Sequence, residues 1–406
     1  MMTEKPESPI EGPLSQKLPD PQEGALKQKE TAILQACQSR DLEALASLAE
    51  SPGGFLTDTI RQEAWPILLG LSPEKTENDS EDSWKSLPRH KDEDQVQLDV
   101  NRAFVYYPNH DNEALLNLQK TQLSTLILST LRHHSQLSYF QGYHDISQVL
   151  LLVLPPSTRY PALSHLSLLR IRDFMLPSLS PAISQLRLLP DILRLSDPPL
   201  WQHLSSTEPF FALSGTLTMY AHDITTLGEI TRLFDVLLSK EPVFTIYLFA
   251  AIVRSRREEL LDIPFDEPEM LHSILSKLPN PLDIEGLIRD AVSLMKEFPP
   301  ERLPQWKRIS RWSVLKTGRS GVQWKIEEGE EFFQKQVREL EWKEKRDKAI
   351  KVLWAYRRPM RNVGLTVVVG VLAVLLRRYG GGHQLLGDRG GPLGYVTEIL
   401  RAWWWR

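Results

Sequence analysis

The most constraining feature of this sequence is the spacing of its apolar residues, which recur at helical intervals and rarely alternate as they do in strands. Between residues 95 and 261, apolar runs at 115–131, 146–154, 210–220 and 230–238 are separated by short breaks marked by proline or glycine. Few stretches have period two, no turn sequence indicates a hairpin, and no repeat of about 20–50 residues is present. The spacing therefore predicts an all-α fold.

Breaks in composition divide the chain into five predicted parts. Residues 1–29 are rich in Pro, Glu, Gln and Ser and contain no apolar run, which indicates disorder. The helical pattern begins near Glu30, and Thr57 is expected to cap a second helix, whereas residues 72–94 read as an exposed loop. We expect a disordered N-terminus (1–29), an all-helical body (30–300), a basic helical linker (301–361), a membrane anchor (362–378) and a Gly-rich tail (379–406).

Charge is distributed unevenly along the chain, although the net charge is only −4. Residues 301–361 contain 17 Lys and Arg against 9 Asp and Glu, whereas residues 1–300 contain 26 against 41. An acidic body therefore precedes a basic segment, and the low net charge argues against a nucleic-acid binder that works by bulk charge. The one cysteine, Cys37, excludes a disulfide framework and a zinc site of several thiolates, and we expect it to be a small buried residue.

Familiar catalytic motifs are absent from the sequence. It contains no GxxxxGK[ST] phosphate loop, no HExxH zinc motif and no GxSxG nucleophile motif. The pair His133 and His134 lacks a carboxylate at metal-ligand spacing, so we expect two solvent-facing histidines. We therefore predict neither a metal nor a cofactor for this chain.

The first polar cluster that could carry function is Asp99 and Arg102. On a helix these two residues lie at i and i+3, away from the apolar face of Val96, Val100 and Ala103. A carboxylate one turn before an arginine can accept from the guanidinium and fix its direction. Taken alone, such a pair is most often a surface ion pair worth less than about 1 kcal/mol.

The second cluster is the heptapeptide that begins at Tyr139 and ends at Asp145. Gln141 and Gly142 lie in a tight break before the apolar run at 146–154, and a glycine there permits a backbone turn that would strain other residues. A glutamine in that break projects from a loop with a short reach. The alternative is helix punctuation, with Asp145 as an N-cap and Gln148 completing a capping-box-like pair.

Considered together, the motifs resemble the TBC (Tre-2/Bub2/Cdc16) domain family of Rab GTPase-activating proteins. Residues 61–70 are similar to the family's opening RxxxW-P-x-LLG helix, residues 96–102 to IxxDxxR with Val for Ile, and residues 139–145 to YxQGxxD. A later block at 210–238 is similar to a downstream helix pair, so the resemblance covers roughly residues 55–260. One departure is Gly215, where the family usually has Trp.

The resemblance implies a multi-helix domain that stimulates GTP hydrolysis by a GTP-bound Rab GTPase. By residue match, Arg102 is the arginine finger and Gln141 the glutamine finger, while Asp99 holds Arg102 and Tyr139, Gly142 and Asp145 shape the turn that presents Gln141. Arg61 and Trp65 are expected to be structural. GTP and magnesium would belong to the partner. The alternatives are a non-catalytic module that tethers a Rab GTPase and a helical scaffold without a GTPase role.

An uncharged apolar run of fifteen residues at 362–376 suggests a location. It is shorter than the roughly 17–25 residues of a spanning helix, although Arg361 and Arg377 could snorkel to either interface. A buried or interfacial helix is the alternative. We expect a single-pass C-terminal anchor, a basic segment facing lipid headgroups and a body in the cytosol. Resemblance to a membrane-anchored branch of the family implies the endoplasmic reticulum or early secretory membranes.

Overall fold

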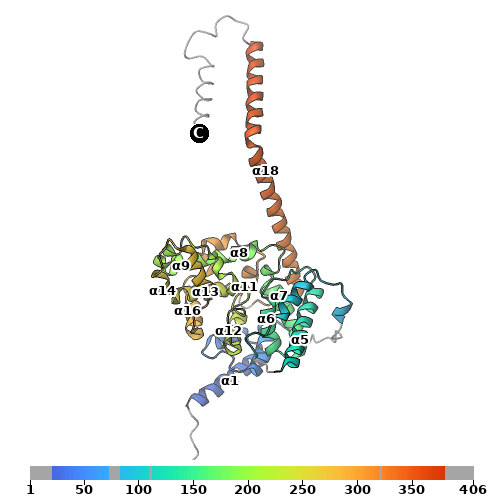
Figure 1. Ribbon diagram of the computed structural model, residues 1–406, viewed down its shortest axis with the longest axis vertical. Coiled ribbons are helices and arrows are strands. Elements are labelled where there is room, and N and C mark those ends of the chain that lie inside the picture. Colours follow the sequence, from blue (N-terminus) through green and yellow to red (C-terminus); the bar gives the residue numbers. More distant parts are fainter. Residues whose placement is uncertain (1–20, 73–82, 109–111, 320–321, 380–406) are drawn as a thin grey trace, which may run out of the picture. The chain divides into compact units, whose positions relative to one another are not determined.

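The computed structural model describes residues 21–72, 83–108, 112–319 and 322–379, and within these ranges every regular element is helical (Figure 1). The predicted all-α fold is therefore confirmed for the described residues. The α-helices are α1 (Pro21–Ser39), α2 (Leu42–Glu50), α3 (Asp58–Leu68), α4 (Glu93–Asn101), α5 (Glu113–His133), α6 (Tyr143–Val153), α7 (Pro156–Leu169), α8 (Ser180–Leu186), α9 (Leu188–Ser196), α10 (Pro198–His203), α11 (Leu213–Leu217), α12 (Leu227–Ser239), α13 (Phe244–Ser255), α14 (Arg257–Leu261), α15 (Pro268–Leu275), α16 (Ile284–Glu297), α17 (Val314–Thr317) and α18 (Ile326–Tyr379). Short 3-10 helices are η1 (Ser83–Ser86), η2 (Arg172–Phe174), η3 (Pro209–Ala212), η4 (Pro300–Arg302) and η5 (Pro304–Arg308).

The N-terminal boundary differs from the prediction. Helix α1 begins at Pro21, so residues 21–29, which we expected to be disordered, are helical. A proline at the start of a helix costs no hydrogen bond, and the Ala, Leu, Lys and Gln that follow are good helix formers. Thr57 caps α3 as predicted, with its hydroxyl accepting from the Ile60 amide at 3.4 Å. The remaining N-terminal residues 1–20 and the Gly-rich tail from 380 onwards lie outside the described residues.

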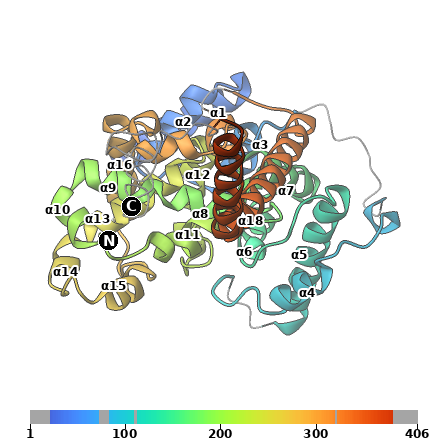
Figure 2. The same ribbon diagram turned by 90° about the horizontal axis from the view of Figure 1, so that it is seen from above.

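Two groups of helices pack around a shared central helix (Figure 2). In the first group, α5 and α6 contact each other and both contact α4 and α7. The second group consists of α9, α10, α13 and α16. Helix α12 contacts α2, α3 and α6 as well as α16, and its residues from Ile230 to Leu238 are all buried. Because α12 packs against helices of both groups, it occupies the core that joins them.

A buried carboxylate, that of Asp235 on α12, ties this central helix to the start of the body. Asp235 is fully buried and accepts hydrogen bonds from Arg61 Nε at 3.0 Å, from Trp65 Nε1 at 2.9 Å and from the Phe55 amide at 3.0 Å. Arg61 also pairs with Asp58 at 2.8 Å, on the surface side of α3. Arg61 and Trp65 thus share one acceptor far along the chain, and both side chains serve to hold α3 on α12.

The C-terminal boundary of the body also differs from the prediction, because the compact unit extends to Arg338 rather than to Pro300. The buried side chains of Arg172 and Asp173 explain the difference. Arg172 Nε donates to Gln336 Oε1 at 2.8 Å, and Gln336 Nε2 donates to Asp173 Oδ1 at 2.8 Å. Phe332 and Phe333 are buried beside this network, so the first turns of α18 belong to the core of the body.

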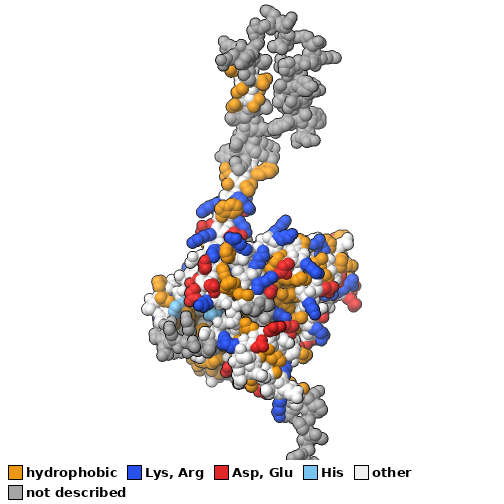
Figure 3. Space-filling model, turned by 180° about the vertical axis from the view of Figure 1, so that it is seen from behind, with side chains coloured by type: hydrophobic (Ala, Val, Ile, Leu, Met, Phe, Trp, Pro, Cys, Tyr) orange, Lys and Arg blue, Asp and Glu red, His pale blue; other side chains and the backbone are white. Residues whose placement is uncertain are grey.

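Beyond Arg338, α18 continues through a second unit that begins at Glu339. Trp342 and Trp354 are 61% and 63% exposed, and Figure 3 shows many Lys and Arg side chains along this part of the helix. Among the residues whose side chains are described, no helix is long and apolar enough to cross a membrane. The anchor at 362–378 therefore stays a prediction.

His134 and Gly215 both have tertiary surroundings that bear on the sequence analysis. His134 is buried and its Nδ1 lies 2.9 Å from Glu330 Oε1 on α18, so the expectation of two solvent-facing histidines is wrong. At Gly215, an added Cβ would lie 3.1 Å from the ring of Tyr220 and 3.3 Å from that of Phe249. The space beside Gly215 is therefore already filled by two aromatic rings, which accounts for the absence of a large side chain at this position.

We predict that Asp235→Ala lowers the free energy of unfolding by about 3–5 kcal/mol, because it leaves the buried guanidinium of Arg61 with one surface partner. Asp58→Ala is the matched control, since it removes the other carboxylate on Arg61. Asp58 is 47% exposed, so its loss should cost less than about 1 kcal/mol. Chemical denaturation of both variants measures the difference, and equal losses would contradict the central role given to Asp235.

Candidate functional site

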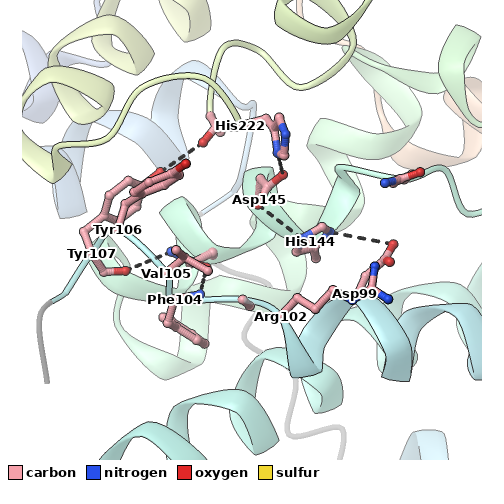
Figure 4. Close-up of a pocket in the computed structure, with 13 residues that line it drawn as sticks. Asp99, Arg102, Phe104, Val105, Tyr106, Tyr107, His144, Asp145 and His222 are labelled. Carbon is pink, nitrogen blue, oxygen red and sulfur yellow. Dashed lines mark hydrogen bonds and ion pairs between the residues drawn. The ribbon is translucent and has the colours of Figure 1, made fainter.

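A surface cavity of about 280 Å³ brings the two predicted polar clusters together (Figure 4). Arg102 and Gln141 both line it, although they come from different elements, the end of α4 and the turn before α6. Its walls also include Asp99, Ala103, Phe104, Val105, Tyr106, Tyr107, His144, Asp145, Gln148, Ala221 and His222.

Arg102 lies immediately after α4 and its side chain is exposed. Its guanidinium forms neither a hydrogen bond nor an ion pair with any residue that the structure describes, so the expected contact with Asp99 is not made. The buried Asp99 instead accepts from Tyr139 Oη at 2.9 Å and from Gln95 Nε2 at 2.9 Å. Asp99 thus joins α4 to the segment before Gln141, and Arg102 keeps its donors available to another molecule.

A buried glutamine anchors the loop that follows Arg102. Gln148 Oε1 accepts from the Phe104 amide at 3.0 Å, and Gln148 Nε2 donates to the Tyr107 carbonyl at 3.0 Å. Phe104 has a φ of 64°, in the left-handed region, which turns the chain sharply at this point. We call residues 103–107, which follow Arg102, the arginine loop. Gln148 therefore does not take part in a capping box, because both polar atoms of its amide bond to the backbone of this loop.

Gln141 projects from a tight turn that requires glycine at the next position. Gly142 has a φ of 99°, and a Cβ there would lie 2.5 Å from the Thr218 side chain. Helix α6 begins directly after it at Tyr143, so Asp145 lies within the first turn and is not the N-cap. The Gln141 side chain is exposed and makes no hydrogen bond with a described residue. Gln141, like Arg102, therefore lies exposed at the cavity with its polar atoms available to another molecule.

A chain of polar contacts runs beneath the two exposed side chains. Tyr139 Oη, which donates to Asp99, lies 3.3 Å from His144 Nδ1, and His144 Nε2 lies 3.2 Å from Asp145 Oδ1. Asp145 Oδ2 accepts from His222 Nδ1 at 2.9 Å. This hydrogen bond raises the pKa of His222, while burial and the Asp99 carboxylate raise the pKa of Tyr139. Tyr139 therefore stays a neutral hydroxyl donor.

The segment from Thr218 to His222, after α11, supports both sides of the cavity. Ala221 accepts from Tyr107 Oη of the arginine loop at 3.3 Å, while Thr218 packs against Gly142 and His222 binds Asp145. Met219 and Tyr220 have φ values of 50° and 66°, so two successive residues of this support are left-handed. Sequence reasoning missed this segment, since its only local signal is a histidine without a recognisable motif.

The cavity can bind and polarise an acceptor on another molecule. It presents a guanidinium with a planar set of donors and a carboxamide that can both donate and accept. No group of three or more His, Cys, Asp or Glu among the described residues is placed to hold a metal ion. Two polar side chains that make no contact with a described residue, and that lie on one cavity, suit charge neutralisation and orientation at a partner's reacting group.

Comparison with known proteins places this geometry in a family. Residues 58–261 match the Rab-GTPase-TBC domain. GTPase-activating protein gyp10 of Schizosaccharomyces pombe is 34% identical over 72% of this chain and 79% of its own length. TBC1 domain family member 20 of Homo sapiens is 35% identical over 68% of this chain and 69% of its own length.

A solved RabGAP TBC domain from Chlamydomonas flagella covers 68% of this chain and 95% of that domain, at 14% identity and a TM-score of 0.49. A likeness at that level adds nothing to the assignment. The family match over residues 58–261 and the relatives that are about one third identical over most of the chain are sufficient. The chain belongs to the TBC domain family of Rab GTPase-activating proteins.

Proposed function

We propose that this protein stimulates GTP hydrolysis by a GTP-bound Rab GTPase and that Arg102 and Gln141 are the two groups it inserts. The observation that supports this most strongly is the placement of both side chains on one cavity, each exposed and without a partner among the described residues. The loop after Arg102 is held by hydrogen bonds from Gln148 to Phe104 and Tyr107, and the turn after Gln141 depends on the positive φ of Gly142. The backbone next to each of these residues is thus held before the partner arrives.

The proposed mechanism divides two tasks between the side chains. Negative charge on the β–γ bridging and γ-phosphoryl oxygens of GTP is neutralised by the guanidinium of Arg102, a device worth about 10³–10⁵ in rate. The carboxamide of Gln141 donates to one oxygen and accepts from the attacking water, which orients the nucleophile. Neither task requires the protein to take up or release a proton, and Mg²⁺ would be held by the GTPase.

A non-catalytic module that tethers a Rab GTPase is the second candidate. It would use the same surface, because binding also needs a cavity rimmed by available donors. The unengaged state of both Arg102 and Gln141 favours catalysis, since a tether needs neither a guanidinium nor a carboxamide at the phosphates.

We further propose that residues 362–378 anchor the protein in the endoplasmic reticulum or early secretory membranes, where it would act on Rab GTPases of endoplasmic reticulum–Golgi traffic. Support comes from the uncharged run at 362–376 and from the basic stretch before it. The described side chains of Val367, Val368, Val369, Val371 and Val374 are 54–64% exposed. The basic segment would face anionic headgroups on the cytosolic side.

Arg102→Lys should remove most of the stimulated hydrolysis while preserving the charge, because lysine lacks the planar fork of donors. The expected loss approaches the 10³–10⁵ that an arginine finger contributes. Single-turnover GTP hydrolysis with a panel of Rab GTPases measures it. Arg187→Lys, an exposed arginine that does not line the cavity, is the matched control. An undiminished rate in Arg102→Lys would overturn the finger assignment.

Gln141→Ala should lower the single-turnover rate at saturating protein by about 10²-fold or more, because the water loses its orienting group. Binding to a Rab GTPase loaded with a non-hydrolysable GTP analogue should change little. Gln97→Ala is the control, since Gln97 is exposed on α4, donates to Asn101 at 3.0 Å and does not line the cavity. If Gln141→Ala weakens binding and leaves the saturated rate intact, the tethering function is the better description.

Removing residues 362–406 should release the protein from cellular membranes into the soluble fraction, because the only uncharged run of this length is lost. Removing residues 380–406 alone is the matched control and should leave membrane association intact. Alkaline extraction followed by sedimentation tests both. Retention of the 362–406 deletion on extracted membranes would place the anchor elsewhere.

A further inference from the structure

Three exposed apolar side chains lie next to Arg102. Val105 is 71% exposed, Tyr106 53% and Leu98 53%. Val105 and Tyr106 line the same cavity as Arg102, and Leu98 lies one helical turn before Arg102 on α4. We call these three residues the apolar rim. Val105 and Tyr106 border the cavity beside Arg102, and Figure 4 shows them on the segment between Arg102 and Tyr107.

The backbone holds Val105 and Tyr106 outward. Phe104 and Tyr107, on either side of them, are 8% and 5% exposed and point inward. The Phe104 amide and the Tyr107 carbonyl are both bound by Gln148, and Tyr107 is bound again by Ala221. Turning Val105 and Tyr106 into the core would break these buried hydrogen bonds, so their exposure is built into the loop.

Because these three apolar side chains are exposed, a partner that covers them would remove apolar surface from water and thereby gain binding free energy. Covering apolar side chains of this size is favourable, and apolar groups gathered at the edge of a polar site commonly mark a surface that a partner covers. Reach identifies that partner. Arg102 and Val105 are three residues apart, so their Cα atoms are separated by at most about 11 Å. A protein surface that presents a bound phosphate group to Arg102 can therefore reach Val105 and Tyr106 as well, because all three line one cavity.

We propose that the apolar rim binds an apolar patch on the GTP-bound Rab GTPase beside its nucleotide and thereby selects which Rab GTPases are accepted. This inference rests on the proposed function. A second copy of this chain or a lipid surface seated on the rim would block the cavity from its substrate, so the GTPase is the occupant that the geometry allows. Val105 and Tyr106 touch no reacting atom, and their contribution is to binding and partner choice.

The test separates binding from catalysis in the full chain purified in mild detergent. In the double variant Val105→Ser and Tyr106→Ser, kcat/KM toward the preferred Rab GTPase should fall at least about tenfold through KM, with kcat retained. The ratio of kcat/KM between preferred and poor Rab GTPases should shrink. Phe265→Ser is the matched control, because Phe265 is 65% exposed and does not line the cavity.

The outcomes are distinguishable. If the wild type stimulates a Rab GTPase, Arg102→Lys abolishes stimulation and the double variant keeps its kcat/KM, the rim inference is overturned and the proposed function stands. A loss of kcat at unchanged KM also overturns it. If the wild type stimulates no Rab GTPase, both the proposed function and the rim inference are overturned. Thermal unfolding of the double variant should match that of the wild type, and Tyr106→Lys provides a second variant with the same expected rise in KM.

Discussion

The buried carboxylate of Asp235 is the interaction on which the arrangement of the site depends. It accepts from Arg61, Trp65 and the Phe55 amide, residues that precede it by 170 to 180 positions. Through these bonds α3 is fixed on α12, and both helices pack on α6. Helix α6 begins one residue after Gly142 and carries Gln148. The position of Gln141 and the support of the arginine loop therefore both depend on the hydrogen bonds that Asp235 accepts in the core.

The backbone segments that carry Arg102 and Gln141 are held by the same two elements, α6 and the segment from Thr218 to His222. Gln148 reaches from α6 to the loop after Arg102, while the segment from Thr218 to His222 contacts that loop and the glutamine turn. These contacts hold the backbone next to both residues, and the guanidinium of Arg102 and the carboxamide of Gln141 stay without a partner among the described residues. Binding of a partner then requires little further ordering of this backbone, which lowers the entropic cost of association.

Local rules predicted much of this molecule, and long-range contacts decided the rest. Apolar spacing predicted the all-α fold, Thr57 is the predicted cap, and Gly142 forms the predicted turn, since each depends on neighbouring residues. The roles of Asp99 and Gln148 depend on partners about 40 positions away, so their expected local bonds gave way to tertiary ones. Burial of His134 and extension of the body to Arg338 likewise require α18 to return to the core, which no local pattern indicates.

The close packing of Tyr220 against Gly215 makes the side chains that these two positions can hold depend on each other. The volume that a large side chain at 215 would need is occupied by the ring of Tyr220, whose hydroxyl also donates to the Thr245 carbonyl at 2.8 Å. Tyr220 is in turn one of the left-handed residues of the segment that supports the cavity. A bulky residue at 215 would have to displace this ring, and the shape of the support beneath the site would change with it.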